Sequence, residues 1–312
     1  FRRVLFRSPA SNSRRRVINM MYCSTRWSRI IQCAMLTTDD HSRDSAGLYY
    51  VYPVVSRRAG GVSVGINLNP NNACNWACLY CQVENLSRGG PPPIDLGRLE
   101  KELAVFLEDV LHGDFLQRNA PPEARQLVDI AFSGNGEPTS AAEFEAAVLV
   151  VARVLAQFEL AGSLPVRLIT NGSLLHRPNV QSAIRHIGLL GGEVWFKIDR
   201  AKDAEVAQIN GIPGDRARVL KNLRSCAALA PTWVQTCWFK LDGNAPSAES
   251  RDAYCDLLRE VADKLAGVHL YGLARPSQQP AATRLSAVST DELVAFGQQI
   301  EKQTGIRVIV SP

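Results

Sequence analysis

The sequence predicts an α/β fold built around a parallel sheet, and three observations lead to this prediction. From about residue 61 onward, short apolar or β-branched runs alternate with longer helical patterns, which is typical of βα units. About six such units follow one another along the chain. The 312 residues exceed the usual size of one domain, although an α/β barrel often fills this length as a single unit.

The expected elements follow in order from Gly61. Strands are predicted at 61–69, 126–134, 165–172, 193–199, 233–242 and 268–276, with a closing strand at 306–312. The first helix repeats apolar residues at spacings of three and four behind an Asp95 cap. Ser140 with Glu143, and Ser289 with Glu292, have the spacing of capping boxes at the start of two further helices.

The charge is unevenly distributed, and this divides the chain into segments. Residues 1–34 contain eight arginines and no acid, so the net charge of +5 leaves −3 for the rest of the chain. The opening FRRVLFRS resembles a translated sequencing adapter. We therefore expect 1–34 to be a non-native leader before a native start at Met35, or alternatively a disordered basic arm. We expect 35–60 to be an N-terminal extension and 61–312 to form the core.

Three cysteines are clustered at a spacing that suits an iron–sulfur cluster. Cys74, Cys78 and Cys81 lie within eight residues, so their thiolates can ligate three irons of a cubane and leave the fourth iron open. Such an open iron can chelate the amino and carboxylate groups of a methionine moiety. The alternatives are a zinc site, which lacks a second ligand pair here, or three unrelated buried cysteines.

The other cysteines are isolated, and no secretion signal or apolar run of about eighteen residues accompanies them. We therefore expect a cytoplasmic protein with reduced thiols and no membrane contact. Core packing is the expected role of Cys226, Cys237 and Cys255.

The motif Cys74-x-x-x-Cys78-x-x-Cys81, with Tyr80 just before the last cysteine, resembles the defining motif of the radical S-adenosylmethionine (radical SAM) superfamily. The resemblance covers most of 61–276. It implies a partial (β/α)6 barrel of the TIM type with the cluster loop after its first strand. It also implies a [4Fe-4S] cluster on the three cysteines, S-adenosylmethionine as cofactor, and Tyr80 near the adenine.

Further motifs match the same superfamily. Asn135-Gly136-Glu137-Pro138 resembles its GGEP stretch, with Asn135 in place of the commonest glycine, and a carboxylate there suits the methionine ammonium. Thr170-Asn171-Gly172 resembles its TNG, and 209–214 loosely resembles a glycine motif near adenine. Each is also a good turn sequence. The cofactor-binding candidates are Tyr80, Gly136, Glu137, Pro138, Thr170, Asn171 and Asp199.

Charged residues within the later strands are the catalytic candidates. By period-two alternation Lys197 shares a strand face with Asp199, and Lys240 shares one with Asp242. Arg275 ends another strand. We expect Lys197, Lys240 and Arg275 to contact substrate or balance charge at the cluster; the alternative is an ion-pair ring that only seals the barrel.

The resemblance implies an enzyme that reductively cleaves S-adenosylmethionine to a 5′-deoxyadenosyl radical, with an external one-electron reductant of the flavodoxin or ferredoxin type. FSGNGEPT, TNG, KID and ARP look closest to iron–sulfur oxidoreductases related to tRNA wyosine synthases, which points to a nucleoside or RNA substrate. The net charge of −3 argues against tight phosphate binding, so a peptide, a partner enzyme or a small molecule stays open. The alternative is a non-enzymatic iron–sulfur electron carrier or redox sensor.

Overall fold

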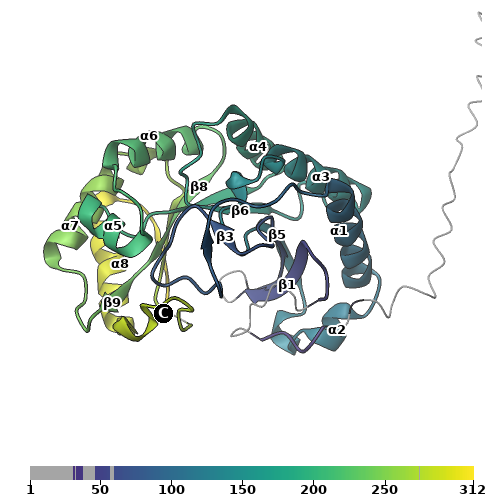
Figure 1. Ribbon diagram of the computed structural model, residues 1–312, viewed down its shortest axis with the longest axis horizontal. Helices are drawn as coiled ribbons and strands as arrows, with labels where there is room; N and C mark the ends of the chain where they lie inside the picture. The colour runs from purple at the N-terminus through teal and green to yellow at the C-terminus, as the bar shows by residue number, and fades with distance from the viewer. Residues whose placement is uncertain (1–30, 32, 38–45, 57–59, 274) are drawn as a thin grey trace, which may run out of the picture. The chain divides into compact units, whose positions relative to one another are not determined.

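The fold is a curled, mostly parallel half-barrel flanked by helices (Figure 1). The structure is a computed structural model that describes residues 31, 33–37, 46–56, 60–273 and 275–312. These belong to one compact unit, Ile31–Pro312. Most of the expected 1–34 leader lies outside the described residues, but Ile31 packs into the core.

Eight strands form the main sheet, and all neighbouring pairs are parallel except the first. In sheet order they are β1 (Val51–Ser56), β2 (Gly61–Ile66), β5 (Leu127–Phe132), β6 (Val166–Thr170), β7 (Glu193–Lys197), β8 (Thr232–Cys237), β10 (Gly267–Tyr271) and β12 (Val308–Ser311). The α/β partial barrel predicted from the sequence is therefore confirmed, including the closing strand.

Helices follow the parallel strands along the chain and cover the outer face of the sheet (Figure 1). They are α1 (Leu96–Leu111), α2 (Phe115–Asn119), α3 (Phe144–Gln157), α4 (Pro178–Leu189), α5 (Asp203–Asn210), α6 (Arg216–Ala227), α7 (Ala248–Arg259) and α8 (Thr290–Thr304). The described part of the chain also has short 3-10 turns at Pro122–Ala124, Pro138–Ser140, Ala262–Lys264 and Ala282–Arg284. Within the described residues, no helix combines the length and apolar character needed to span a bilayer.

Two expectations about strands need correction. The sheet begins with β1, before Gly61, and β1 pairs antiparallel with β2 at the sheet edge. Pro53 interrupts the apolar run of β1, and an edge strand is one of the few positions in a sheet that tolerate proline. The run 233–242 is two strands, because after β8 the chain leaves the main sheet and β9 (Phe239–Leu241) pairs with β11 (Leu285–Ala287) instead.

The helix caps were predicted with mixed success. Asp95 caps α1 through the Arg98 amide, and Ser289 with Glu292 forms the predicted capping box of α8. The Ser140–Glu143 box is wrong. Ser140 ends a 3-10 turn, where its hydroxyl donates to the Glu137 carbonyl at 2.6 Å, and α3 starts later without a side-chain cap.

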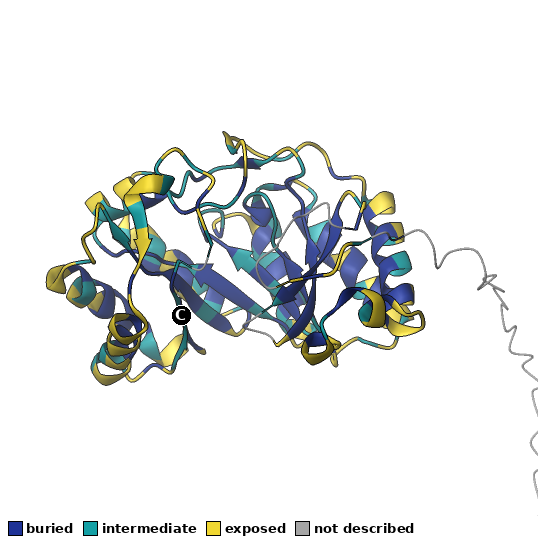
Figure 2. Ribbon diagram, turned by 90° about the horizontal axis from the view of Figure 1, so that it is seen from below, coloured by how far each residue is buried: buried dark blue, intermediate teal, exposed yellow. Residues whose placement is uncertain are grey.

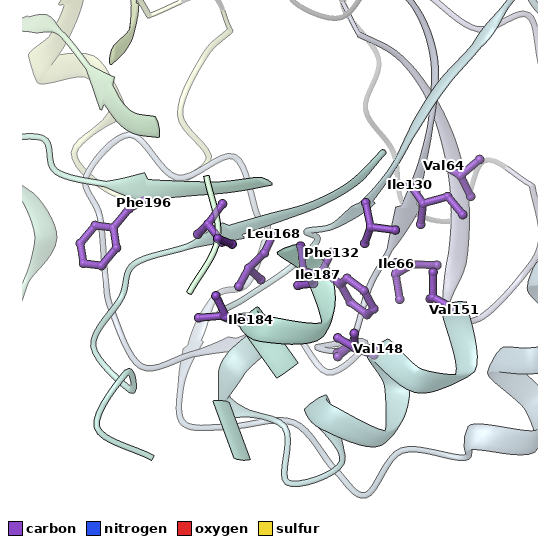
Figure 3. Close-up of a cluster of buried hydrophobic side chains, with 14 of the residues drawn as sticks. Val64, Ile66, Ile130, Phe132, Val148, Val151, Leu168, Ile184, Ile187 and Phe196 are labelled. Carbon is purple, nitrogen blue, oxygen red and sulfur yellow. The ribbon is translucent and has the colours of Figure 1, made fainter. Parts of the chain in front are cut away.

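The apolar core lies between the sheet and the helices. Figure 3 shows Ile130, Phe132 and Leu168 of the sheet against Val148 of α3 and Ile184 of α4. All are fully buried, and burying each such side chain contributes about 1.5–3 kcal/mol. Exposed residues are concentrated on the outer helices and in loops (Figure 2). Because outward-facing residues supply this core, alternate residues on each strand face the inside of the barrel.

Candidate functional site

The inside of the half-barrel holds a cavity of about 590 Å³. The three motif cysteines and Glu137 line it, together with polar side chains from the inner faces of the strands. In barrels of this kind the loops after the carboxyl ends of the strands carry the chemistry. The cavity therefore brings the predicted motif residues to the expected end of the sheet.

The cysteine loop follows β2, as predicted. Its first cysteine lies in β3 (Ala73–Cys74), which pairs with β4 (Ser87–Arg88) over two residues. A tight turn closes the loop, because the amide of Cys81 donates to the carbonyl of Cys78 at 3.0 Å. These contacts hold the three cysteines in one short, folded segment at the cavity wall.

The three cysteines of this loop are half-buried. Burial raises the pKa of Cys74 to about 11, and burial together with the nearby Asp199 raises the pKa of Cys78 to about 12. The Trp76 amide donates to Cys74 Sγ at 3.4 Å. Among the described residues, no three His, Cys, Asp or Glu side chains converge as the ligands of a single ion would. The three cysteines line one cavity, and thiolates are the ligands that iron–sulfur clusters take.

The Glu137 carboxylate is held by several hydrogen bonds from its neighbours. Its Oε1 accepts from the amide and hydroxyl of Thr139 at 3.1 and 2.6 Å and from the Thr170 hydroxyl at 2.6 Å. Among the described residues, the Asn171 amide is the hydrogen-bond donor to its Oε2, at 2.7 Å. Burial raises the pKa of this carboxyl, and the donors oppose that rise. A carboxylate so arranged lines the cavity with acceptor capacity left at Oε2.

The neighbouring motif residues hold Glu137 and the cysteine loop together. Thr170 and Asn171 bond Glu137, and Asn171 Nδ2 also donates to Asn75 Oδ1 of the cysteine loop at 2.8 Å. Pro138 is the first residue of the 3-10 turn after Glu137. A Cβ on Gly136 would lie 2.1 Å from the Ala73 carbonyl oxygen, so only glycine permits this approach.

Tyr80, Asp199 and Lys197 form a buried polar group beside Cys78. The Tyr80 hydroxyl donates to Asp199 Oδ2 at 2.5 Å, and Lys197 Nζ lies 3.8 Å from Asp199 Oδ1. Lys197 also donates to the Tyr271 hydroxyl at 3.1 Å. Burial alone would lower the pKa of Lys197, but Asp199 and Tyr271 outweigh it and hold the ammonium charged. Lys197 and Asp199 therefore share one face, as the alternation predicted.

The other two catalytic candidates are placed differently. Arg275 lines the cavity. Lys240 does not line it: β9 has left the main sheet, and Lys240 Nζ pairs with Glu292 Oε2 at 3.0 Å. Asp242 pairs with Arg284 at 2.7 Å, in the same small sheet region. The alternation rule identified a shared face for Lys240 and Asp242, but the strand that carries it is outside the barrel.

The cavity also holds a charged group that was not predicted from the sequence. Arg167 of β6 bonds Glu193 through Nε at 2.8 Å and Asp129 of β5 through Nη1, and Asp129 also accepts from Ser63. Burial raises the pKa of Asp129, while Arg167 opposes the rise. The signal was present in the sequence, because Asp129 and Arg167 each interrupt an apolar strand run.

Cys237 also has a place that was not expected. It is 1% exposed and packs near Tyr80 and Phe239, as core packing requires, but it also lines the cavity. All seven described cysteines are free thiols. Cys226 and Cys255 lie in α6 and α7 and do not line the cavity.

Comparison with known sequences gives distant relatives. No protein-family profile matches the chain. A UPF0026 protein of Helicobacter pylori (strain J99) is 27% identical over 246 residues, which are 78% of this chain and 70% of that protein. A UPF0026 protein of Methanocaldococcus jannaschii is 28% identical over 51% of this chain and 42% of its own. The GTPase Obg of Brachyspira hyodysenteriae is 26% identical over 42% of this chain, a stretch that spans only 16% of the GTPase.

Comparison with solved structures identifies the fold. A radical SAM methyltransferase from Sphaerobacter thermophilus superposes with a TM-score of 0.54 at 16% identity, covering 83% of this chain and 68% of that one. SuiB of Streptococcus suis, bound to the precursor peptide SuiA, superposes with a TM-score of 0.53 at 11% identity. The match covers 81% of this chain and 49% of SuiB. A spore photoproduct lyase mutant with bound AdoMet and dinucleoside spore photoproduct superposes with a TM-score of 0.51 at 12% identity. The match covers 83% of this chain and 78% of the lyase. The chain thus has the partial barrel fold of radical SAM enzymes.

Proposed function

We propose that this chain is a radical SAM enzyme that binds a [4Fe-4S] cluster through Cys74, Cys78 and Cys81 and reductively cleaves S-adenosylmethionine. The observation that carries the proposal is that these thiols and the Glu137–Asn171 network line one cavity inside the half-barrel. When bound, the cluster and the nucleotide supply the electron transfer and the 5′-deoxyadenosyl radical. The protein supplies orientation and the exclusion of water.

The residues of the chain divide the binding of S-adenosylmethionine among them. Glu137 Oε2 would accept from the methionine ammonium, since Oε1 already accepts three hydrogen bonds from Thr139 and Thr170. Asn171 holds the cysteine loop against this carboxylate through Asn75. Tyr80, held by Asp199, would present its ring to the adenine, as the resemblance to radical SAM enzymes implies.

We propose that the substrate occupies the part of the cavity between the cysteines and the Asp129–Arg167 pair. Lys197 and Arg275 line the cavity, whereas Lys240 does not, so the first two are the substrate-side candidates. The solved relatives with bound ligands carry a peptide in one case and a dinucleoside in another. A small molecule, a nucleoside or RNA, and a peptide therefore all remain within the proposal.

The same proposal implies a partner and a compartment. One electron per cleavage must come from outside the chain, and a flavodoxin or ferredoxin is the proposed donor. Free thiols as cluster ligands require a reducing compartment, for which we propose the cytoplasm. The net charge of −3 after residue 34 favours a substrate bound without extensive phosphate contacts.

The test is anaerobic purification, reconstitution with iron and sulfide, reduction, and assay for 5′-deoxyadenosine. We expect S-adenosylmethionine-dependent release by the wild-type chain and none by Cys78→Ala. Cys255→Ala is the matched control, because this buried cysteine of α7 does not line the cavity. A fully assembled, reducible cluster that releases no 5′-deoxyadenosine would support an electron carrier or redox sensor instead.

A further inference from the structure

The C-terminal end of α5 is docked onto the cysteine loop. The amides of Ala77 and Leu79, on either side of Cys78, donate to the carbonyls of Asn210 and Ile209 at 3.0 and 2.8 Å. The next residue, Gly211, ends the helix with φ +65°, and a Cβ there would lie 3.0 Å from Ala77. Conformation and close approach both require glycine at this position.

The side chain of Asn210 reaches Cys78 itself. It is 1% exposed, and its Nδ2 donates to Cys78 Sγ at 3.3 Å and to Asp199 Oδ2 at 2.8 Å. A sulfur and a carboxylate are both acceptors, so the NH₂ side of the amide must face them. The amide therefore lies between two groups that are both anionic when Cys78 is a metal ligand.

Asp199 cannot move away from this amide without breaking other bonds. Its Oδ1 accepts the Cys237 amide at 3.0 Å, and its Oδ2 also accepts the Tyr80 hydroxyl. The carboxylate is 1% exposed. Asn210 is thus fixed by its place at the end of α5 and by the hydrogen bond to this carboxylate, and its Nδ2 also donates to the sulfur.

We propose that Asn210 is a positioning residue for the cluster: its N–H···S hydrogen bond orients the Cys78 thiolate and raises the reduction potential of the bound cluster. This rests on the proposed function. A hydrogen bond to a ligating sulfur stabilises the reduced, more negative state of a cluster, and outer-shell donors orient ligands. The amide also lies between the Asp199 carboxylate and the sulfur. It thereby reduces the repulsion between these two negative groups, which likewise raises the reduction potential.

The test is the midpoint potential of the cluster in the anaerobically reconstituted full chain, without added S-adenosylmethionine, read by electron paramagnetic resonance. Asn210→Leu keeps the branching and approximate size of the side chain but removes both donors. We expect Asn210→Leu to have full iron content and a midpoint potential more negative than that of the wild type. Asn119→Leu is the control, because it removes a buried amide that donates to the Cys33 carbonyl outside the cavity lining, and its potential should equal that of the wild type.

A fully loaded Asn210→Leu variant with the wild-type potential overturns the proposal. If this variant loads no iron, Asn210→His decides, because it keeps an N–H donor at the same position. The proposal then requires Asn210→His to load and to approach the wild-type potential, and absence of iron in both variants contradicts it. Hydrogen exchange at Ala77 and Leu79 in the metal-free chain checks that α5 stays docked. Because the potential is read on the cluster alone, failure here is distinct from a loaded wild type that releases no 5′-deoxyadenosine.

Discussion

The hydroxyl of Tyr80 donates to Asp199 Oδ2 at 2.5 Å and so joins the cysteine loop to the end of β7. Because the acceptor is a buried carboxylate, Tyr80→Phe should reduce the free energy of unfolding by about 1.5–3 kcal/mol. Urea denaturation of the metal-free chain measures this. Tyr254→Phe is the control: its hydroxyl pairs with the neutral Thr236 hydroxyl, so about 0.5–1.5 kcal/mol is expected. Equal losses would mean that the Asp199 bond carries no additional, charge-assisted strength.

Lys197 and Lys240 make a matched pair of lysines, one inside the cavity and one outside. Lys197→Met leaves Asp199 without its ammonium partner, so 5′-deoxyadenosine release should fall at least about tenfold, equivalent to about 1.4 kcal/mol. Lys240→Met should leave this rate unchanged and shift stability by no more than about 0.5 kcal/mol, because its partner Glu292 is solvent-exposed. Equal effects of the two changes on the rate would remove Lys197 from the site.

The features that sequence reasoning located correctly are those coded by local spacing. The three cysteines are close in sequence, and the apolar run of β2 places them after a buried strand. The Ser289 capping box needs only four consecutive residues, and it forms as expected. The Ser140–Glu143 pattern has the same spacing and does not form a cap, because the Ser140 hydroxyl donates to the Glu137 carbonyl instead, so spacing predicts a cap only where no nearby acceptor competes.

The features that were missed depend on contacts between distant residues. The same alternation rule put both Lys197 and Lys240 on inner faces, but the chain leaves the sheet between Cys237 and Phe239. The sequence gives no local signal of this break, because Trp238 is as apolar as a strand residue. In the structure its ring is buried by stacking on Phe296, with 4.2 Å between the ring centroids. The contact of Asn210 with Cys78 spans 132 residues and has no local signature.

The deep ion pair gives a prediction about pH. The folded-state pKa of Asp129 lies above its ordinary value of 3.8. Ionisation of this carboxyl therefore lowers the stability of the folded state as pH rises from the unfolded-state pKa through the folded-state pKa. Arg167→Gln removes the opposing cation and raises this pKa further. Its loss of stability should therefore be about 3–5 kcal/mol at pH 7, the usual cost of breaking a buried pair, and smaller at pH 5.

Urea denaturation at the two pH values measures this difference. The double variant Asp129→Asn/Arg167→Gln has no buried carboxylate at this position, so its stability should depend less on pH than that of Arg167→Gln. A deficit of Arg167→Gln that is the same at both pH values would show that packing of the arginine, and not its charge, matters there.

Gly136 is where the Glu137 loop meets the strand of the first cysteine. A Cβ at this position would lie 2.1 Å from the Ala73 carbonyl oxygen and 2.7 Å from the Asn69 side chain, so Gly136→Ala must push β3 or the loop aside. Such overpacking costs about 1–3 kcal/mol.

Because the displacement separates Glu137 from the cysteines, the affinity of Gly136→Ala for S-adenosylmethionine should fall at least about tenfold, or about 1.4 kcal/mol, as measured by calorimetry on the reconstituted chain. Gly90→Ala adds the same methyl group where nothing lies within 4 Å, and should bind as the wild type does. Wild-type affinity in Gly136→Ala would mean that the close contact of these two segments is not needed to assemble the binding site.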